Sequence, residues 1–229
     1  MSFARHRDFS IQRLTVGQER APLMVIDNAL ADADALVEMA AGKPYGDVTS
    51  YYPGVRAKVP LSFQRYVLDD LRQEFVSMFG LNGGSLRFTA CHFSLVTTPA
   101  AQLGYMQRIP HIDSVSSNEL AFVLYLFKAD HGGTAFYRHR KSGYEVVDQT
   151  RIAEYTRLVE AEREEVLRSP PAYINGSNDF YELVGRQDGV FNRMLAYRRT
   201  SLHSGDIRPD FVPLTDPRRG RLSVNGFIA

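Results

Sequence analysis

The sequence contains a single cysteine, Cys91, among 229 residues. One cysteine cannot form an internal disulfide or a zinc site built from several thiolates, and this usage fits a reducing compartment. We therefore expect the protein to be cytoplasmic. Residues 1–13 carry several charges and no apolar core segment, so we expect no secretory signal there.

An excess of charge of one sign and long apolar runs are also missing. The chain has 27 Lys and Arg against 26 Asp and Glu, a formal net charge of +1. This balance gives no electrostatic reason to expect nucleic acid or an anionic membrane as a partner. No apolar run approaches the length needed to cross a bilayer. With 44% hydrophobic residues, the chain can bury one substantial core, so we expect a single domain over 1–229.

Two segments with apolar residues at helical spacing precede the main run of strands. The first follows Asp32, a residue type that caps helix N-termini, and the second ends at Gly80. The stretch between them, 45–60, is rich in Gly, Pro and Tyr and is expected to form a loop. We interpret residues 1–84 as helical support for a core over 85–229.

The core region shows patterns typical of strands. The run 120–127 is apolar on both faces, as a central strand would be, and a turn at 131–133 leads into a strand over 134–137. We interpret this pair as a hairpin. A helix is expected over 150–168, inside an insert at about 150–181. Further strands are expected over 86–96, 191–197 and 221–228. Many strands after two helices predict a mainly β sandwich with supporting helices.

A His-x-Asp motif, His111 and Asp113, lies just ahead of the 120–127 run. Side chains two residues apart in an extended chain share a face, so both can point into one cavity. An imidazole and a carboxylate are two of the three ligands of the facial triad that holds non-haem Fe(II). His203, directly after the 191–197 strand, is the candidate third ligand. The alternative is a surface turn at the motif and a solvated imidazole at a strand end.

The last predicted strand adds a basic side chain. Arg221 and Ser223 share a face by alternation, and a guanidinium next to a hydroxyl is suited to bind a carboxylate. Arg219 has the same parity but lies in the preceding loop, so it remains an alternative. We prefer Arg221 because it opens the strand.

The order of these features resembles the iron(II)/2-oxoglutarate-dependent dioxygenases, nearest the prolyl 4-hydroxylase-like branch. It is carried by the His-x-Asp motif, the Gly132-Gly133-Thr134 turn, a strand into His203 and a basic residue opening the last strand. The resemblance covers about 86–228, and the opening strand at 25–28 is also similar. It implies a double-stranded β-helix, the jelly-roll or cupin-like fold.

The resemblance also implies a ligand set and an activity. Fe(II) would be held by His111, Asp113 and His203, and 2-oxoglutarate would be anchored by Arg221 with Ser223. O₂ and 2-oxoglutarate would be consumed and succinate released, while a C–H bond of an amino acid, peptide or protein side chain is hydroxylated. The stretch from His203 to Arg221 is longer than is common in such enzymes, and residues 207–217 would have to absorb the excess.

Further contacts are predicted around this site. Tyr105 and Gln107 precede the motif and are candidates for contact with the cosubstrate. Candidates for substrate contact are Tyr137, Arg138, His139, Arg140, Arg193, Tyr197 and the loop 173–181.

Two other interpretations stay open. One is a cupin-like metal-binding or sugar-modifying protein without 2-oxoglutarate, in which Arg221 has no role. The other is a non-enzymatic interaction module in which the two histidines and the aspartate never meet. The sequence leaves open whether the substrate is a small molecule, a peptide or a protein, and which oligomeric state the protein adopts.

Overall fold

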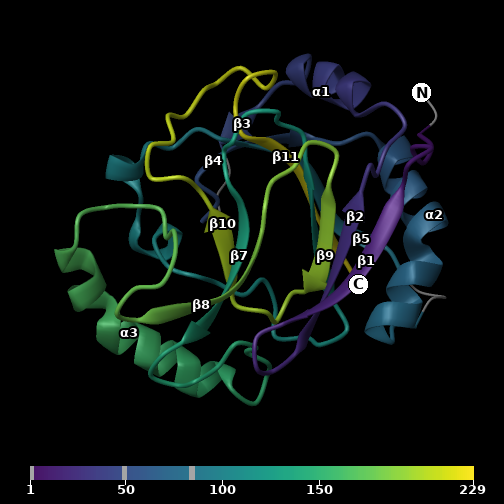
Figure 1. The fold of residues 1–229 in the computed structure, drawn as a ribbon. Helices are drawn as coiled ribbons and strands as arrows, with labels where there is room; N and C mark the ends of the chain where they lie inside the picture. Colours follow the sequence, from purple (N-terminus) through teal and green to yellow (C-terminus); the bar gives the residue numbers. More distant parts are fainter. Residues whose placement is uncertain (1–2, 48–50, 83–85) are drawn as a thin grey trace.

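The computed structural model describes residues 3–47, 51–82 and 86–229, and two facing antiparallel sheets dominate this part of the chain (Figure 1). The large sheet consists, in spatial order, of β1 (Ser10–Val16), β2 (Ala21–Asp27), β9 (Met194–Arg198), β6 (Leu120–Tyr125), β11 (Leu222–Ile228), β5 (Phe88–Val96), β4 (Gly54–Lys58) and β3 (Gly46–Asp47). The small sheet consists of β10 (His203–Asp206), β7 (Gly133–His139) and β8 (Tyr181–Gln187). Two facing antiparallel sheets of this kind form a jelly-roll, so the predicted mainly β fold class is confirmed.

Helices cover the outer faces of both sheets. In Figure 1, α1 (Ala33–Ala41) and α2 (Leu61–Phe79) lie outside the large sheet, and α3 (Ile152–Arg168) lies beside the small sheet. Two short 3₁₀ turns, η1 (Ala100–Gln102) and η2 (Tyr105–Gln107), follow β5. No helix in the described ranges combines the length and the apolar character that crossing a bilayer requires.

The strand period of two divides the apolar residues of the large sheet between two cores. On β2, Met24 and Ile26 pack toward the helices, whereas Leu23 and Val25 face the small sheet. The space between the sheets is therefore lined by alternate residues of each strand. A third core, which includes Tyr137, packs α3 against the outer face of the small sheet.

Local signals position the helices as predicted. The Asp32 side chain accepts a hydrogen bond from the Ala35 backbone N–H at 2.9 Å, which caps α1. Gly80 ends α2 with φ +61°, the left-handed conformation that glycine adopts readily. The helix predicted over 150–168 is α3. The predicted boundary between residues 84 and 85 falls outside the described residues.

The hairpin predicted around residues 131–133 is wrong. β6 pairs with β9 and β11 in the large sheet, whereas β7 pairs with β10 and β8 in the small sheet. Gly132 (φ +76°) lies so close to the small sheet that a Cβ there would sit 1.7 Å from the Asp206 carbonyl oxygen. Two consecutive apolar strands thus belong to opposite sheets, and the chain between them crosses from one sheet to the other.

Other corrections concern strand positions. The loop predicted over 45–60 contains β3 and β4, and β1 and β8 lie where no strand was predicted. The strand predicted over 191–197 begins at Met194, because Asn192 (φ +64°) forms a turn. The Asn192 side-chain oxygen accepts from Leu30 N–H at 2.9 Å, and its amide donates to the Leu30 carbonyl at 2.8 Å.

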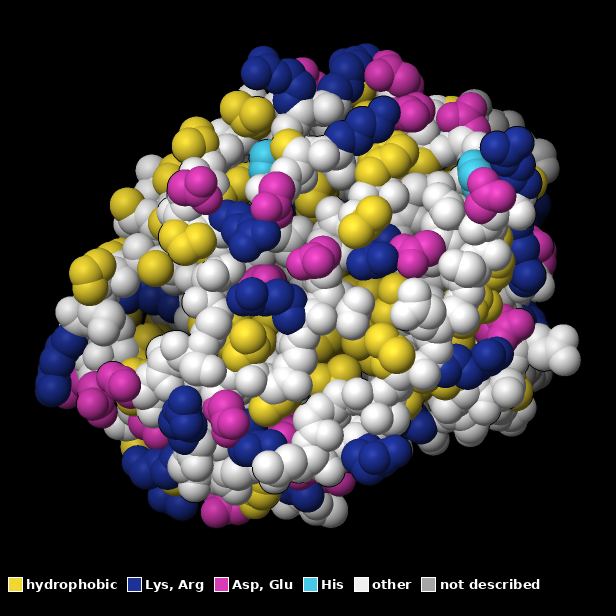
Figure 2. Space-filling view, viewed as in Figure 1, with side chains coloured by type: hydrophobic (Ala, Val, Ile, Leu, Met, Phe, Trp, Pro, Cys, Tyr) yellow, Lys and Arg dark blue, Asp and Glu magenta, His cyan; other side chains and the backbone are white. Residues whose placement is uncertain are grey.

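The surface carries both signs of charge. In the view of Figure 2, Lys and Arg side chains are interspersed with Asp and Glu, and no large area of one sign is visible on that face. This distribution matches the near-zero net charge of the sequence.

Candidate metal centre

The fold brings His111, Asp113 and His203 together at one end of the space between the sheets. His111 and His203 form an isolated antiparallel bridge, with N–H···O distances of 2.9 and 3.0 Å in the two directions. This bridge places the two imidazoles side by side, with ring centroids 4.5 Å apart. The Asp113 backbone N–H donates to the Arg199 carbonyl at 2.9 Å, which fixes the turn that follows.

The three side chains direct their polar atoms toward a common point. His111 Nε2 lies 3.8 Å from Asp113 Oδ1, and His203 Nε2 lies 3.5 Å from Asp113 Oδ2. One ligand atom from each residue lies within 4.8 Å of the other two. Within the described residues, this is the only group of three or more His, Cys, Asp or Glu side chains with such a geometry.

The imidazole of His203 presents a lone pair to this point. Its Nδ1 lies 2.9 Å from the Ser201 carbonyl oxygen, which can only accept, so Nδ1 carries the proton and Nε2 is left free. Burial, and then the neighbouring His203, lower the pKa of His111 to about 4, although Asp113 opposes this shift. His111 lies deep in the protein but lines the cavity, from which 42% of its side-chain surface is accessible. Two imidazoles and one carboxylate are the donor set of a non-haem Fe(II) facial triad, so the residues fit this metal.

Neighbouring side chains hold the ligands in place. Arg199 donates from Nη2 to the Asp113 carbonyl at 2.8 Å, forms an ion pair with Glu119 and stacks over Phe227 at 4.1 Å. The ring of Tyr197 contacts His203 edge-on, with centroids 4.7 Å apart. These contacts restrict the positions of both Asp113 and His203.

A cavity of about 390 Å³ opens from the three residues and runs between the two sheets. Arg221 and Ser223 line it, as the alternation in the last strand predicts. Arg221 is only 6% exposed, and it donates from Nε to the His131 carbonyl at 3.0 Å and from Nη2 to the Gly133 carbonyl at 2.6 Å. Two of its five N–H groups are therefore used to orient the guanidinium, and the others remain for a ligand.

Other predicted site residues lie elsewhere. Arg219 is exposed and does not line the cavity, and its carbonyl accepts a hydrogen bond from the His131 ring at 3.2 Å. Tyr105 is not brought to the cavity either: its hydroxyl donates to the Val159 carbonyl of α3 at 2.7 Å. Gln107 does line the cavity, and the Ser223 hydroxyl donates to Asn225 Oδ1 at 2.6 Å.

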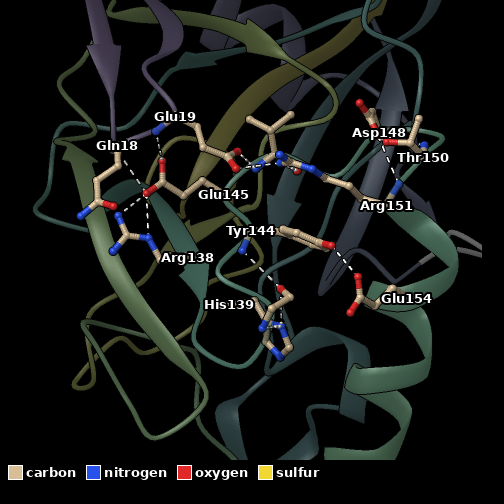
Figure 3. A network of polar contacts seen from close by, with 12 residues as sticks. Gln18, Glu19, Arg138, His139, Tyr144, Glu145, Asp148, Thr150, Arg151 and Glu154 are labelled. Carbon is tan, nitrogen blue, oxygen red and sulfur yellow. Dashed lines mark hydrogen bonds and ion pairs between the residues drawn. The ribbon is translucent and has the colours of Figure 1, made fainter.

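The candidates for substrate contact divide into two groups. Tyr173 and Tyr197 line the cavity. Arg138 instead forms ion pairs with Glu145 and Glu182, and its contact with Glu145 is visible in Figure 3. The remaining candidates with side-chain partners elsewhere are His139, which contacts Glu162, and Arg193, which contacts Asp27.

Sequence reasoning missed Tyr52 and Arg56, which line the cavity from the predicted loop over 45–60. Arg56 lies on β4 and its guanidinium stacks over the Tyr52 ring at 4.5 Å. The sequence from Val55 to Lys58 alternates apolar and basic residues, and this pattern is the signal that could have found the strand.

A sequence model described as "Family of unknown function (DUF6445)" matches residues 7–228. The chain belongs to this family. No curated protein matches the DUF6445 chain. Among solved structures, it is similar to the non-heme alpha ketoglutarate dependent epimerase SnoN from nogalamycin biosynthesis, with a TM-score of 0.50 and 12% identity over 92% of this chain and 78% of that one. HygX from Streptomyces hygroscopicus, with nickel, 2-oxoglutarate and hygromycin B bound, matches at a TM-score of 0.49 and 11% identity over 92% and 84%.

The likeness to SnoN supports the double-stranded β-helix assigned to this DUF6445 chain from its two sheets. At this level of identity it shows the fold alone, so the chemistry has to be argued from the site.

Proposed function

We propose that the protein is an Fe(II)/2-oxoglutarate-dependent oxygenase that hydroxylates a C–H bond of its substrate. The observation that carries the proposal is the convergence of His111, Asp113 and His203 at one end of a cavity that also contains the buried guanidinium of Arg221. The description of SnoN, which shares the fold, as alpha ketoglutarate dependent is compatible with this chemistry.

In this proposal each residue has a defined task. Nε2 of His203, an imidazole nitrogen of His111 and the Asp113 carboxylate would hold Fe(II), which would supply the oxidation chemistry that uses 2-oxoglutarate and O₂. Arg221 binds the distal carboxylate of 2-oxoglutarate through charge-assisted hydrogen bonds, and Ser223 lies beside it. The balanced reaction converts R–H, 2-oxoglutarate and O₂ into R–OH, succinate and CO₂. The sequence predicts an amino acid, peptide or protein side chain as the substrate class, whereas the charges of the cavity lining favour an acid without an ammonium group.

The test is an anaerobic titration of the purified protein with Fe(II) and then 2-oxoglutarate, followed by visible absorption. We expect a weak metal-to-ligand charge-transfer band that is absent in His203→Ala. The control is His6→Ala, which removes a histidine near Asp8, away from the site, and should retain the band. Asp113→Ala should abolish succinate formation, and full turnover in that variant would exclude the assigned ligand set.

Two other outcomes correspond to the alternatives drawn from the sequence. If iron binds but 2-oxoglutarate produces no band, the protein is a cupin-like metal-binding protein that does not use the oxoacid. If neither binds, the three side chains meet without holding a metal, and a non-enzymatic role is favoured. The form of that alternative in which these residues never meet is wrong, because their ligand atoms lie within 4.8 Å of one another.

A further inference from the structure

Arg56 brings a second guanidinium into the cavity, from a different part of the large sheet than Arg221. In the strand register, Arg56 on β4 lies opposite Ser94 of β5, and Ser94 lies opposite Ser223 of β11. Arg56 is thus two strands away from Ser223, about 10 Å across the sheet. It is close enough to Asp113 for the two charges to interact.

The guanidinium of Arg56 is not in direct contact with a carboxylate of the described residues, and Asp113 acts on it only from a distance. Its Nε is buried without a hydrogen-bond partner, and within the described residues no ion pair involves Arg56, whose ring contact is with Tyr52. Three other half-buried arginines have acidic partners: Arg138 with Glu145, Arg193 with Asp27 and Arg199 with Glu119. Arg198 and Arg221 form no ion pair in the part of the chain that the structure describes, and their guanidinium groups donate to backbone carbonyls instead. Arg56 as a whole is half-buried, but its desolvated Nε has no partner, which is costly unless a ligand supplies one.

The charge balance of the cavity indicates what this ligand is. Among the described lining residues, Asp113 is the only acid, and Arg56 and Arg221 are the only Lys or Arg side chains. With a divalent metal bound, these groups carry three net positive charges, and 2-oxoglutarate neutralises two of them. One positive charge remains for the second substrate. The same lining offers no acid other than the metal ligand to pair with a substrate ammonium.

We propose that Arg56 binds a carboxylate of the substrate, and that the substrate is a small monocarboxylic acid with an apolar body. This inference rests on the proposed function, because it assigns Arg221 to 2-oxoglutarate and leaves Arg56 for the molecule that is oxidised. Much of the remaining lining suits an apolar body and includes Met106, Ile109, Ile112, Val123 and Phe227. A planar guanidinium fits a carboxylate in a bidentate manner, which would hold the acid in one orientation beside the metal.

The test uses calorimetric titration of the protein loaded with Ni(II) and 2-oxoglutarate, with hexanoate and its neutral isostere hexanamide as probes. We expect hexanoate to bind about tenfold more tightly than hexanamide, because a charge-assisted hydrogen bond is replaced by a neutral one. Arg56→Met should bind hexanoate and hexanamide equally. The affinity of this variant for 2-oxoglutarate should stay within about threefold of the native value. Arg56→Lys keeps the charge and should retain part of the preference. Arg163→Met, at an exposed arginine of α3, is the matched control and should behave like the native protein.

Three results would overturn the proposal: equal binding of the two probes, no binding of hexanoate, or a tenfold loss of 2-oxoglutarate affinity in Arg56→Met. The last would place Arg56 in the cosubstrate site. If the native protein binds no 2-oxoglutarate, the proposed function fails. The comparison of hexanoate with hexanamide on the Ni(II)-loaded native protein and on Ni(II)-loaded Arg56→Met then still decides whether Arg56 selects a carboxylate, because Arg221 is present in both.

Discussion

Glu145 joins the turn between β1 and β2 to the segment that follows β7. Its carboxylate accepts hydrogen bonds from the backbone N–H groups of Gln18 at 3.1 Å and Glu19 at 2.9 Å, and from Arg138 Nε at 2.9 Å (Figure 3). Residue 17 is glycine at this close approach: a Cβ there would lie 2.0 Å from Glu145 Oε2, so the carboxylate would have to move, and φ is +68°. One buried acid thereby fixes the N-terminal edge of the large sheet.

Gly17→Ala should therefore destabilise the protein more than a positive φ alone would. The left-handed conformation costs an alanine about 1–2 kcal/mol, and displacement of the Glu145 carboxylate adds lost hydrogen bonds, for a total of about 3 kcal/mol. Gly143→Ala is the matched control, since φ is +76° but nothing lies within 4 Å of the added Cβ. Urea denaturation of both variants measures the difference, and equal losses would show that Glu145 moves aside freely.

The choice between the two arginines near the last strand can be tested directly. Arg221→Met should raise the Kd of 2-oxoglutarate at least about tenfold, because a buried charge-assisted contact is lost. Arg219→Met should leave this Kd unchanged, because Arg219 is exposed outside the cavity. Anaerobic titration of the Fe(II)-loaded variants measures both values. A larger effect at position 219 would reverse the assignment.

Among the secondary-structure elements, the helices were predicted well, because helices are determined by interactions between residues that are close in the sequence. Helices α1 and α2 were found from apolar spacing, a capping aspartate and a terminal glycine, all within a few residues of one another. Strand partners depend on contacts between distant segments, so the order of apolar runs suggested a hairpin where β6 and β7 belong to opposite sheets.

In the candidate site, too, the residues that local patterns indicate were predicted, whereas a residue positioned by contacts between distant segments was missed. Alternation over two residues is local, so it predicted that His111 and Asp113 share a cavity and that Arg221 and Ser223 share a face, and all four residues line the same cavity. Arg56 was missed because β4 is short and is stabilised by pairing with β5, which its Gly- and Tyr-rich surroundings do not reveal.

The buried face of α2 packs against the large sheet, and its contribution to the free energy of unfolding can be tested by mutation. Phe75 is fully buried in the core between this helix and the sheet, whereas Leu61, at the start of the same helix, is 68% exposed. Phe75→Ala should lower the free energy of unfolding by about 3–5 kcal/mol, and Leu61→Ala by less than about 0.5 kcal/mol. Chemical denaturation gives both values. Similar losses in the two variants would mean that α2 is not anchored through this face.

At the level of the whole molecule, the candidate metal centre depends on the complete jelly-roll. His111 and Asp113 precede β6, whereas His203 opens β10, and the bridge between His111 and His203 forms only when the small sheet is assembled. The unfolded chain therefore has no preformed site, and a metal that binds the three residues must stabilise the folded state by mass action.

Ni(II), which accepts the same ligand types, should accordingly raise the melting temperature in a concentration-dependent manner. At about 100 times the Kd, the stabilisation is about 2.7 kcal/mol, which corresponds to about 5–10 °C for a chain of this size. Asp113→Ala should lose this shift, while His6→Ala should retain it, because His6 lies near Asp8 and away from the three ligands. A shift that persists in Asp113→Ala would place the bound metal elsewhere, and its absence in the native protein would show that the folded state does not hold the ion.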